Sequence, residues 1–401
     1  MNSTKIIMGI IAIAVAGALL FAFSRPKTLL RNKKGDTDST EATDDTPNES
    51  IVFDEKNQKL RGNILSSEGI EIVRTFYSND GTSQVIYREA NPELSLYFSN
   101  IMGTYTEYAG IDNALETELR CDNPIPTDDN AIGKSAKLTL NASNQKKVYD
   151  IMWNDTNIVG SVTVLDIQSG ALNTMLSTPS FDMNRFRTDN NERVRIINTE
   201  AVNNKAVEPN PLPISILESY MKNKFNTHDF QTITDSCINQ VLRDEFLIDE
   251  EAYIKTDFAD MKNSYDIENM ALSVSPVMLS AIYASFFNGG RIMEPHVLDC
   301  FVDTVSGETV GQPFSPNTLS ELSTDISEEM LKQLPISPLE DGSIVHGDII
   351  CSDNNWIVYG AVINDKPAVI TLTVTDTTFD GLQSSDDVLT LYKKIAESIT
   401  Y

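Results

Sequence analysis

In this 401-residue chain, Ser143 and Ser219 are each followed three residues later by a lysine, Lys146 and Lys222 respectively. On a helix this spacing puts the two side chains one turn apart, so the amine can take the hydroxyl proton and leave a nucleophile. Ser143 precedes the first predicted hairpin, and we interpret its spacing as chance. Ser219 and Lys222 are kept as a candidate nucleophile and base, although an amphipathic helix with Lys222 in solvent gives the same pattern.

Metal and cofactor chemistry has no comparable pattern in this chain. The histidines share no ligand spacing: His228, His296 and His346. The cysteines form no C-x-x-C pair and are interpreted as isolated thiols: Cys121, Cys237, Cys300 and Cys351. The formal net charge is −27, which argues against nucleic acid as a partner. We therefore expect no metal, no cofactor and no nucleic acid.

Alternating apolar residues predict a hairpin near the middle of the chain. Its strands are expected at 161–166 and 171–177, with a turn at Gln168-Ser169-Gly170 and an exit marked by Pro179. A strand at 137–141 and a helix with apolar positions from Ala142 to Met152 precede it.

Later segments predict further helices and a second hairpin. Ser275-Pro276 predicts a helix start, with Ser as the cap and Pro at the first position, and Asn288-Gly289-Gly290 ends that helix. Residues 356–363 and 367–374 predict the second hairpin, and 386–398 predict a C-terminal helix capped by Ser384 or Ser385. These elements indicate an α+β domain.

Residues 160–184, GSVTVLDIQSGALNTMLSTPSFDMN, closely resemble the first hairpin of the transpeptidase domain in class B penicillin-binding proteins. Other matches follow in the family's order, among them Arg61-Gly62-Asn63-Ile64 and the Ser275-Pro276 helix with its Asn-Gly-Gly end. They run from about Arg61 to the C-terminus. The resemblance implies an α+β, penicillin-binding-protein/β-lactamase-like transpeptidase fold: a mainly antiparallel sheet with helices on both faces.

That family carries its chemistry on three motifs, S-x-x-K, S-x-N and K-T-G. The resemblance places the nucleophile at Ser215, after Pro211-Leu212-Pro213, but Glu218 stands where the base lysine is needed. A carboxylate there removes the positive charge that attracts an anionic substrate.

The other two motifs also depart from the family pattern. The second is placed at Ser236, with Ile238 in the position of the Asn and Asn239 one residue away. The third is placed at Val345, His346 and Gly347, of which only Gly347 matches. His346 is interpreted as an edge-strand residue without a catalytic role. No catalytic residue is therefore predicted to be intact in the three motifs.

Four segments are expected along the chain. Residues 1–34 are a membrane anchor with a basic flank, because residues 6–23 contain no charge and span about 27 Å as a helix. Residues 35–60 are an acidic disordered linker, 61–133 a small pedestal region, and 134–401 the transpeptidase-like domain.

The expected orientation has the N-terminus in the cytoplasm and the folded domain outside the membrane. The basic residues after the helix favour the opposite orientation: Arg25, Lys27, Arg31, Lys33 and Lys34. We follow the resemblance because it covers most of the chain.

The resemblance implies a role in bacterial cell-wall synthesis. With three degenerate motifs, we expect a catalytically inactive scaffold or peptide-binding member. The implied partners are a membrane-embedded glycan polymerase and a peptidoglycan stem peptide. One alternative is an active D,D-transpeptidase that uses Ser219 and Lys222. Another is a receptor that senses wall peptides or β-lactams without turnover.

Overall fold

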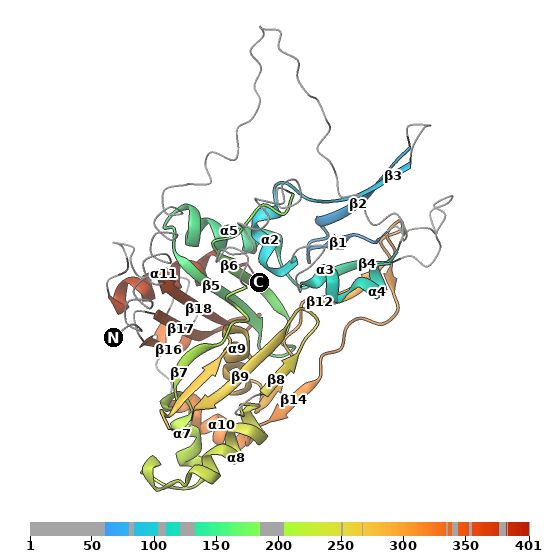
Figure 1. Cartoon of the computed structure of the whole chain (residues 1–401). Coiled ribbons are helices and arrows are strands. Elements are labelled where there is room, and N and C mark those ends of the chain that lie inside the picture. The colour runs from blue at the N-terminus through green and yellow to red at the C-terminus, as the bar shows by residue number, and fades with distance from the viewer. Residues whose placement is uncertain are drawn as a thin grey trace, which may run out of the picture. The chain divides into compact units, whose positions relative to one another are not determined.

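The computed structural model of the chain describes residues 61–79, 84–102, 110–120, 133–184, 204–249, 252–266, 268–333, 336–338, 344–352, 355–376, 382 and 384–400 (Figure 1). The predicted membrane helix at 6–23 and the linker at 35–60 lie outside these residues. Among the described helices, none has both the length and the apolar character needed to cross a bilayer.

A six-stranded antiparallel sheet, the main sheet, has the strand order β15-β16-β17-β18-β5-β6. The two predicted hairpins are β5–β6 and β17–β18, and both lie where they were expected. The first turn forms because the Asp166 carboxylate accepts the N–H groups of Gln168 and Ser169. The strands are β15 (Ile336–Pro338), β16 (Ile344–Ser352), β17 (Asn355–Ile363), β18 (Ala368–Asp376), β5 (Val159–Asp166) and β6 (Leu172–Thr178).

Helices cover both faces of the main sheet, as predicted. Helix α9 (Pro276–Ser285) contacts β5 and β18 on one face. On the other face, Val162 and Val164 pack in one cluster with Tyr149 of α5 (Ala142–Tyr149) and Tyr392 of α11 (Ser385–Ser398). Alternate residues of β5 thus pack into two different cores, one on each face of the sheet. This arrangement confirms the α+β class.

Local capping fixes where these helices begin. The Ser275 hydroxyl accepts the N–H of Met278 at 3.2 Å, with Pro276 in the first turn, as predicted for α9. Ser384, and not Ser385, caps α11. Two 2.8 Å hydrogen bonds join the buried Ser280 hydroxyl of α9 to Thr163 and Thr371 of the sheet. These bonds fix the position of α9 along the strands.

A second six-stranded sheet, the head sheet, has the order β13-β12-β4-β1-β2-β3. It draws strands from both sides of the expected boundary at 133/134, which stays a prediction. At Gly62 a Cβ would lie 1.9 Å from the Lys134 carbonyl oxygen, so only glycine fits this crossing. The strands are β13 (Thr309–Val310), β12 (Leu298–Val302), β4 (Ser135–Leu138), β1 (Ile64–Leu65), β2 (Glu71–Asn79) and β3 (Gln84–Ala90).

Glu68 connects the head sheet to α5. Its carboxylate accepts the N–H groups of Ala142 and Ser143, at 2.8 and 3.0 Å, at the positive end of the helix. Burial acts to raise the pKa of Glu68, but these N–H groups hold it below its usual value. Short helices complete this region: α2 (Ser95–Met102), α3 (Ile111–Ala114) and α4 (Glu116–Leu119).

A third sheet has four antiparallel strands in the order β7-β10-β9-β8. A two-stranded ribbon, β11 (Arg291–Met293) with β14 (Thr318–Glu321), follows α9. The strands of the third sheet are β7 (Asn210–Pro213), β10 (Ala271–Val274), β9 (Asp260–Asp266) and β8 (Ala252–Lys255), and the helices beside it are α7 (Ser215–Lys224), α8 (Asp235–Phe246) and α10 (Thr324–Gln333).

Residues 296–298 join all three sheets. The His296 N–H donates to the Gly170 carbonyl in the first turn of the main sheet. The Val297 carbonyl accepts the N–H of Thr139, just beyond β4 of the head sheet, at 2.7 Å. The Val297 N–H donates to the carboxylate of Asp257, in the turn of the third sheet, at 3.0 Å. A single short segment therefore fixes the sheets relative to one another.

Candidate functional site

Ser215 is the first residue of α7, as expected for a nucleophile that opens a helix. The preceding strand β7 is held by β10, with Leu212 opposite Leu272, and Pro213 ends it. The helix packs against the core through Leu217 and Tyr220. Ser215, at its N-terminal end, is exposed. The position suits a nucleophile, although its neighbours decide whether the hydroxyl can react.

Glu218 and Lys222 form an ion pair on the exposed face of α7. The Lys222 Nζ lies 2.7 Å from the Glu218 Oε1, and both side chains are about one-third exposed. The carboxylate at the position predicted for the motif lysine is thus neutralised by a lysine one turn further along the helix. Lys222 lies on the partly exposed face of an amphipathic helix, as that interpretation expected, and is paired there with Glu218. The i,i+4 spacing was readable in the sequence.

Ser219 lies in the second turn of α7. Only the first four residues of a helix have N–H groups without intrahelical partners, so Ser219 lacks the free amides that Ser215 has nearby. Lys222, its candidate base, already donates to Glu218. Ser143–Lys146 is occupied in the same way, because Lys146 donates to Asp150 at 2.9 Å.

Ser236 lies in the first turn of α8 and is exposed. Ile238, in the position of the motif Asn, is only 2% exposed and packs in the core. Asn239 is exposed on another side of the helix. The position predicted to correspond to the motif Asn therefore holds a core side chain.

Helices α7 and α8 are firmly joined at their C-terminal halves. The Tyr220 hydroxyl donates to the Glu245 carboxylate, and Lys224 pairs with the same carboxylate at 2.6 Å. Burial and the Glu245 contact both raise the pKa of Tyr220 above its usual value. The Tyr220 and Phe246 rings meet edge-on, 5.0 Å apart. This contact fixes α7 without any of the motif residues.

Val345, His346 and Gly347 lie side by side in β16. On one side, β17 places Ala361 opposite His346 and Gly360 opposite Gly347. On the other side, β15 places Ser337 and Ile336 opposite Val345 and His346. His346 is thus in an internal strand at this point, not at the expected sheet edge. The short strand β15 was not predicted.

Gly347, the one residue of the predicted third motif that matches the family pattern, is required by packing. A Cβ at this position would lie 2.1 Å from the Tyr359 carbonyl oxygen and 2.7 Å from the Gly360 Cα. The next residue, Asp348, is exposed and puts a negative charge beside the motif. Burial raises the pKa of the Tyr359 hydroxyl, and the Asp348 charge raises it further.

The described contacts bring two of the three motif positions towards each other. Strand β16 contacts β7, which leads directly into Ser215. The start of α8 lies near Tyr265 of β9: burial raises the pKa of Tyr265, and the charge of Asp235, beside Ser236, raises it further. Convergence of Ser236 on the α7 terminus stays a prediction.

No protein-family model and no curated protein sequence matches this chain. Solved structures do match its fold. Penicillin-binding protein A from M. tuberculosis, as an imipenem acyl-enzyme complex, is 13% identical, with a TM-score of 0.68 over 86% of this chain and 99% of that chain. The D,D-transpeptidase domain of a peptidoglycan glycosyltransferase from Eggerthella lenta is 14% identical, with a TM-score of 0.62 over 84% and 97%. The chain therefore has the fold of the transpeptidase domains of class B penicillin-binding proteins.

Proposed function

We propose that this protein is a membrane-anchored, extracytoplasmic member of the peptidoglycan synthesis machinery that has kept the penicillin-binding fold and lost its transpeptidase chemistry. It acts as a scaffold, or by binding a wall stem peptide, beside a membrane-embedded glycan polymerase. The Glu218–Lys222 ion pair supports this proposal most directly. A carboxylate takes the place of the catalytic base, and the nearest lysine is bound to that carboxylate.

The pattern of retention and loss supports the same proposal. Gly347 is retained where a Cβ would strike the neighbouring strand, and a capping hydroxyl, that of Ser275, is retained at the start of α9. Glu218, Ile238 and Val345 replace residues whose purpose is chemical. The positions that the fold needs are thus kept, and those that the reaction needs are changed.

The expected losses in reaction rate favour a catalytically inactive protein. Loss of one general acid or base costs about 10²–10⁴ in rate. Loss of groups that act as a unit costs on the order of 10⁶. Changes at Glu218, Ile238 and Val345 affect the base, the proton shuttle and the carboxylate cation together. For the protein to remain active, other residues would have to take over all three roles.

Fluorescent penicillin and intact-mass measurement test the proposal on the full-length chain. We expect no covalent adduct, because neither Ser215 nor Ser219 has a free base beside it. Ser215→Ala and Ser219→Ala are the matched controls that would assign any adduct. An adduct on Ser219 that Lys222→Ala abolishes would establish an active transpeptidase and overturn the proposal. Saturable binding of a stem peptide without an adduct would select the peptide-binding role over the scaffold.

A further inference from the structure

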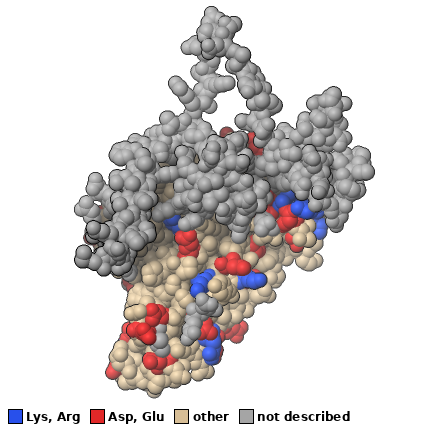
Figure 2. All heavy atoms as spheres, viewed as in Figure 1, with Lys and Arg blue, Asp and Glu red and all other residues tan. Residues whose placement is uncertain are grey.

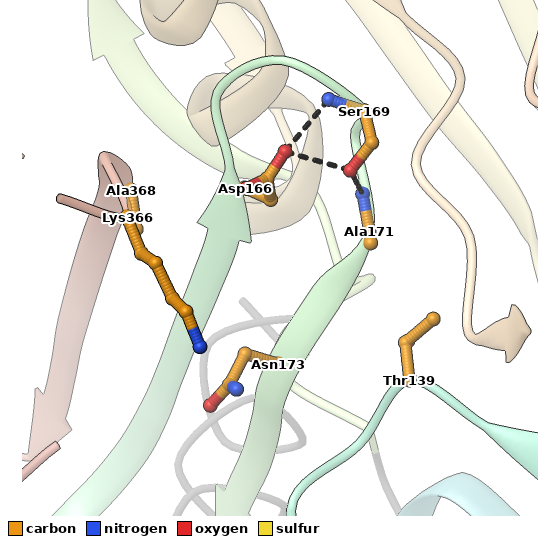
Figure 3. A pocket seen from close by; sticks show the side chains of 7 residues that line it. All are labelled: Thr139, Asp166, Ser169, Ala171, Asn173, Lys366 and Ala368. Atoms are coloured by element: carbon orange, nitrogen blue, oxygen red, sulfur yellow. Dashed lines mark hydrogen bonds between the residues drawn. The ribbon is translucent and has the colours of Figure 1, made fainter. Parts of the chain in front are cut away.

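A cavity of about 230 Å³ lies at one end of the main sheet, between the β5–β6 turn and the β17–β18 turn (Figure 3). None of the motif positions lines it. Ala171 and Ala368 contribute apolar surface, and the polar lining comes from Thr139, Asp166, Ser169, Asn173 and Lys366. We call it the turn pocket.

The backbone around the turn pocket is rigidly held. The Ile167 N–H donates to the Pro367 carbonyl, which joins the two turns directly. The Lys366 N–H donates to the Asn364 side chain at 2.8 Å. The Thr139 hydroxyl donates to the Leu172 carbonyl at 2.7 Å. The walls are therefore pre-formed, so a ligand would not have to order them.

The hydrogen-bond network identifies the oxygen and the nitrogen of the Asn173 side-chain amide. The Thr400 N–H must donate, so the Asn144 atom that it contacts at 3.0 Å is the Oδ1 oxygen. The Asn144 Nδ2 is then the donor to Asn173, at 2.7 Å, and the acceptor is the Asn173 Oδ1. That oxygen also accepts the Thr174 hydroxyl. The Asn173 NH₂ is left as a donor with no partner among the described residues.

Lys366 supplies a second donor and the positive charge. Its ammonium has no ion pair among the described residues, and Figure 3 shows it on the same side of the pocket as the Asn173 amide. Among the residues that line the pocket, Lys366 carries the positive charge. The two donors together suit the two oxygens of a carboxylate.

Asp166 supplies an acceptor at the other end of the pocket. Its Oδ1 accepts two N–H groups and the Ser169 hydroxyl, which fixes the carboxylate. No described group bonds to its Oδ2. The pocket thus offers donors at one end and an anionic acceptor at the other, and its volume fits a small molecule.

We propose that the turn pocket binds a small α-amino carboxylate, such as a free amino acid. Its carboxylate lies between the Lys366 ammonium and the Asn173 amide, and its ammonium faces the Asp166 carboxylate. This site is separate from α7 and β16, and it does not depend on the proposed function.

Calorimetric titration of the full-length chain with leucine, N-acetylleucine and leucinamide tests this proposal. We expect saturable millimolar binding of leucine. Leucinamide, without a carboxylate, should bind about tenfold more weakly or not at all. Lys366→Met should weaken leucine binding by about tenfold while the melting temperature stays unchanged.

Matched controls keep the outcome decisive. Lys255→Met removes an exposed lysine from β8 of the third sheet and should leave leucine binding unchanged. Asp166→Asn should weaken leucine binding but leave N-acetylleucine binding unchanged, because only leucine carries the ammonium. No saturable binding at about 10 mM leucine, or equal binding by Lys366→Met, would overturn the proposal.

Discussion

Gly347→Ala should destabilise the protein strongly, although the sequence places this residue in the predicted third motif. The added Cβ would stand 2.1 Å from the Tyr359 carbonyl oxygen, whereas Cβ contacts below 3.0 Å are essentially never found. The strands must therefore separate by at least 3.0 − 2.1 = 0.9 Å at this point. Strand β16 is paired with β17 along its whole length, so the separation cannot stay within one residue.

The expected cost follows from two contributions. Overpacking of a well-packed site costs about 1–3 kcal/mol, and two weakened ladder hydrogen bonds cost about 1 kcal/mol each. The sum is a loss of about 3–5 kcal/mol in the free energy of unfolding. Such a loss is a large part of the total stability of a typical domain.

Denaturant unfolding followed by tryptophan fluorescence measures this loss, since Trp356 lies in β17 itself. The matched control is Asp348→Ala, which changes the next, exposed residue of β16 and should stay within about 0.5 kcal/mol of the wild type. A loss below about 1 kcal/mol for Gly347→Ala would refute the argument that packing retains this glycine.

Three further outcomes are expected. Burial raises the pKa of Asp257 to about 6, against the N–H groups of Leu298 and Val297 that lower it. Because the folded pKa is raised, the protonated carboxyl stabilises the fold below pH 4. This stabilisation is lost as the pH rises through 6, and the free energy of unfolding falls by about 3 kcal/mol. Asp257→Asn should flatten this part of the plot of stability against pH, and an unchanged plot would contradict the assignment. Ser275→Ala should cost about 1 kcal/mol in thermal or denaturant unfolding, whereas Thr234→Ala should cost much less because Thr234 caps α8 without a side-chain bond; equal costs would count against the cap. Protease added to intact protoplasts should digest the domain from residue 61 onwards, and protection of that domain would reject the proposed topology.

Elements with strong local signals could be predicted from the sequence. Ser275-Pro276 and Asp166 act on residues within a few positions, so α9 and the first turn were predicted well. Strand β4 ends at Leu138, earlier than predicted, because Asn141 leaves the strand to accept the N–H of Asn144 as the cap of α5. The helix predicted through Met152 changes at Asp150 to a wider π-helical turn. Such competition between neighbouring signals is not visible in apolar periodicity.

The candidate site was harder to predict because its residues come from distant segments. The resemblance placed Ser215 at a helix start, which the structure confirms. It did not predict β15 opposite Val345 and His346, since a three-residue segment that ends in Pro338 gives no strand signal. The turn pocket was also missed. Thr139, Asp166 and Lys366 become neighbours only when the strands are in place.

The strand order of the main sheet has a consequence for synthesis of the chain. Strands β5 and β6 are made early and pair at once, but β5 must wait about 200 residues for its other partner, β18. The head sheet waits as well, because β4 pairs with β12, which begins at Leu298. In the nascent chain, both sheets therefore stay incomplete, with unpaired strand edges, until roughly the last hundred residues have been made. Truncation before Asp376 should therefore leave an aggregation-prone product instead of a smaller folded domain.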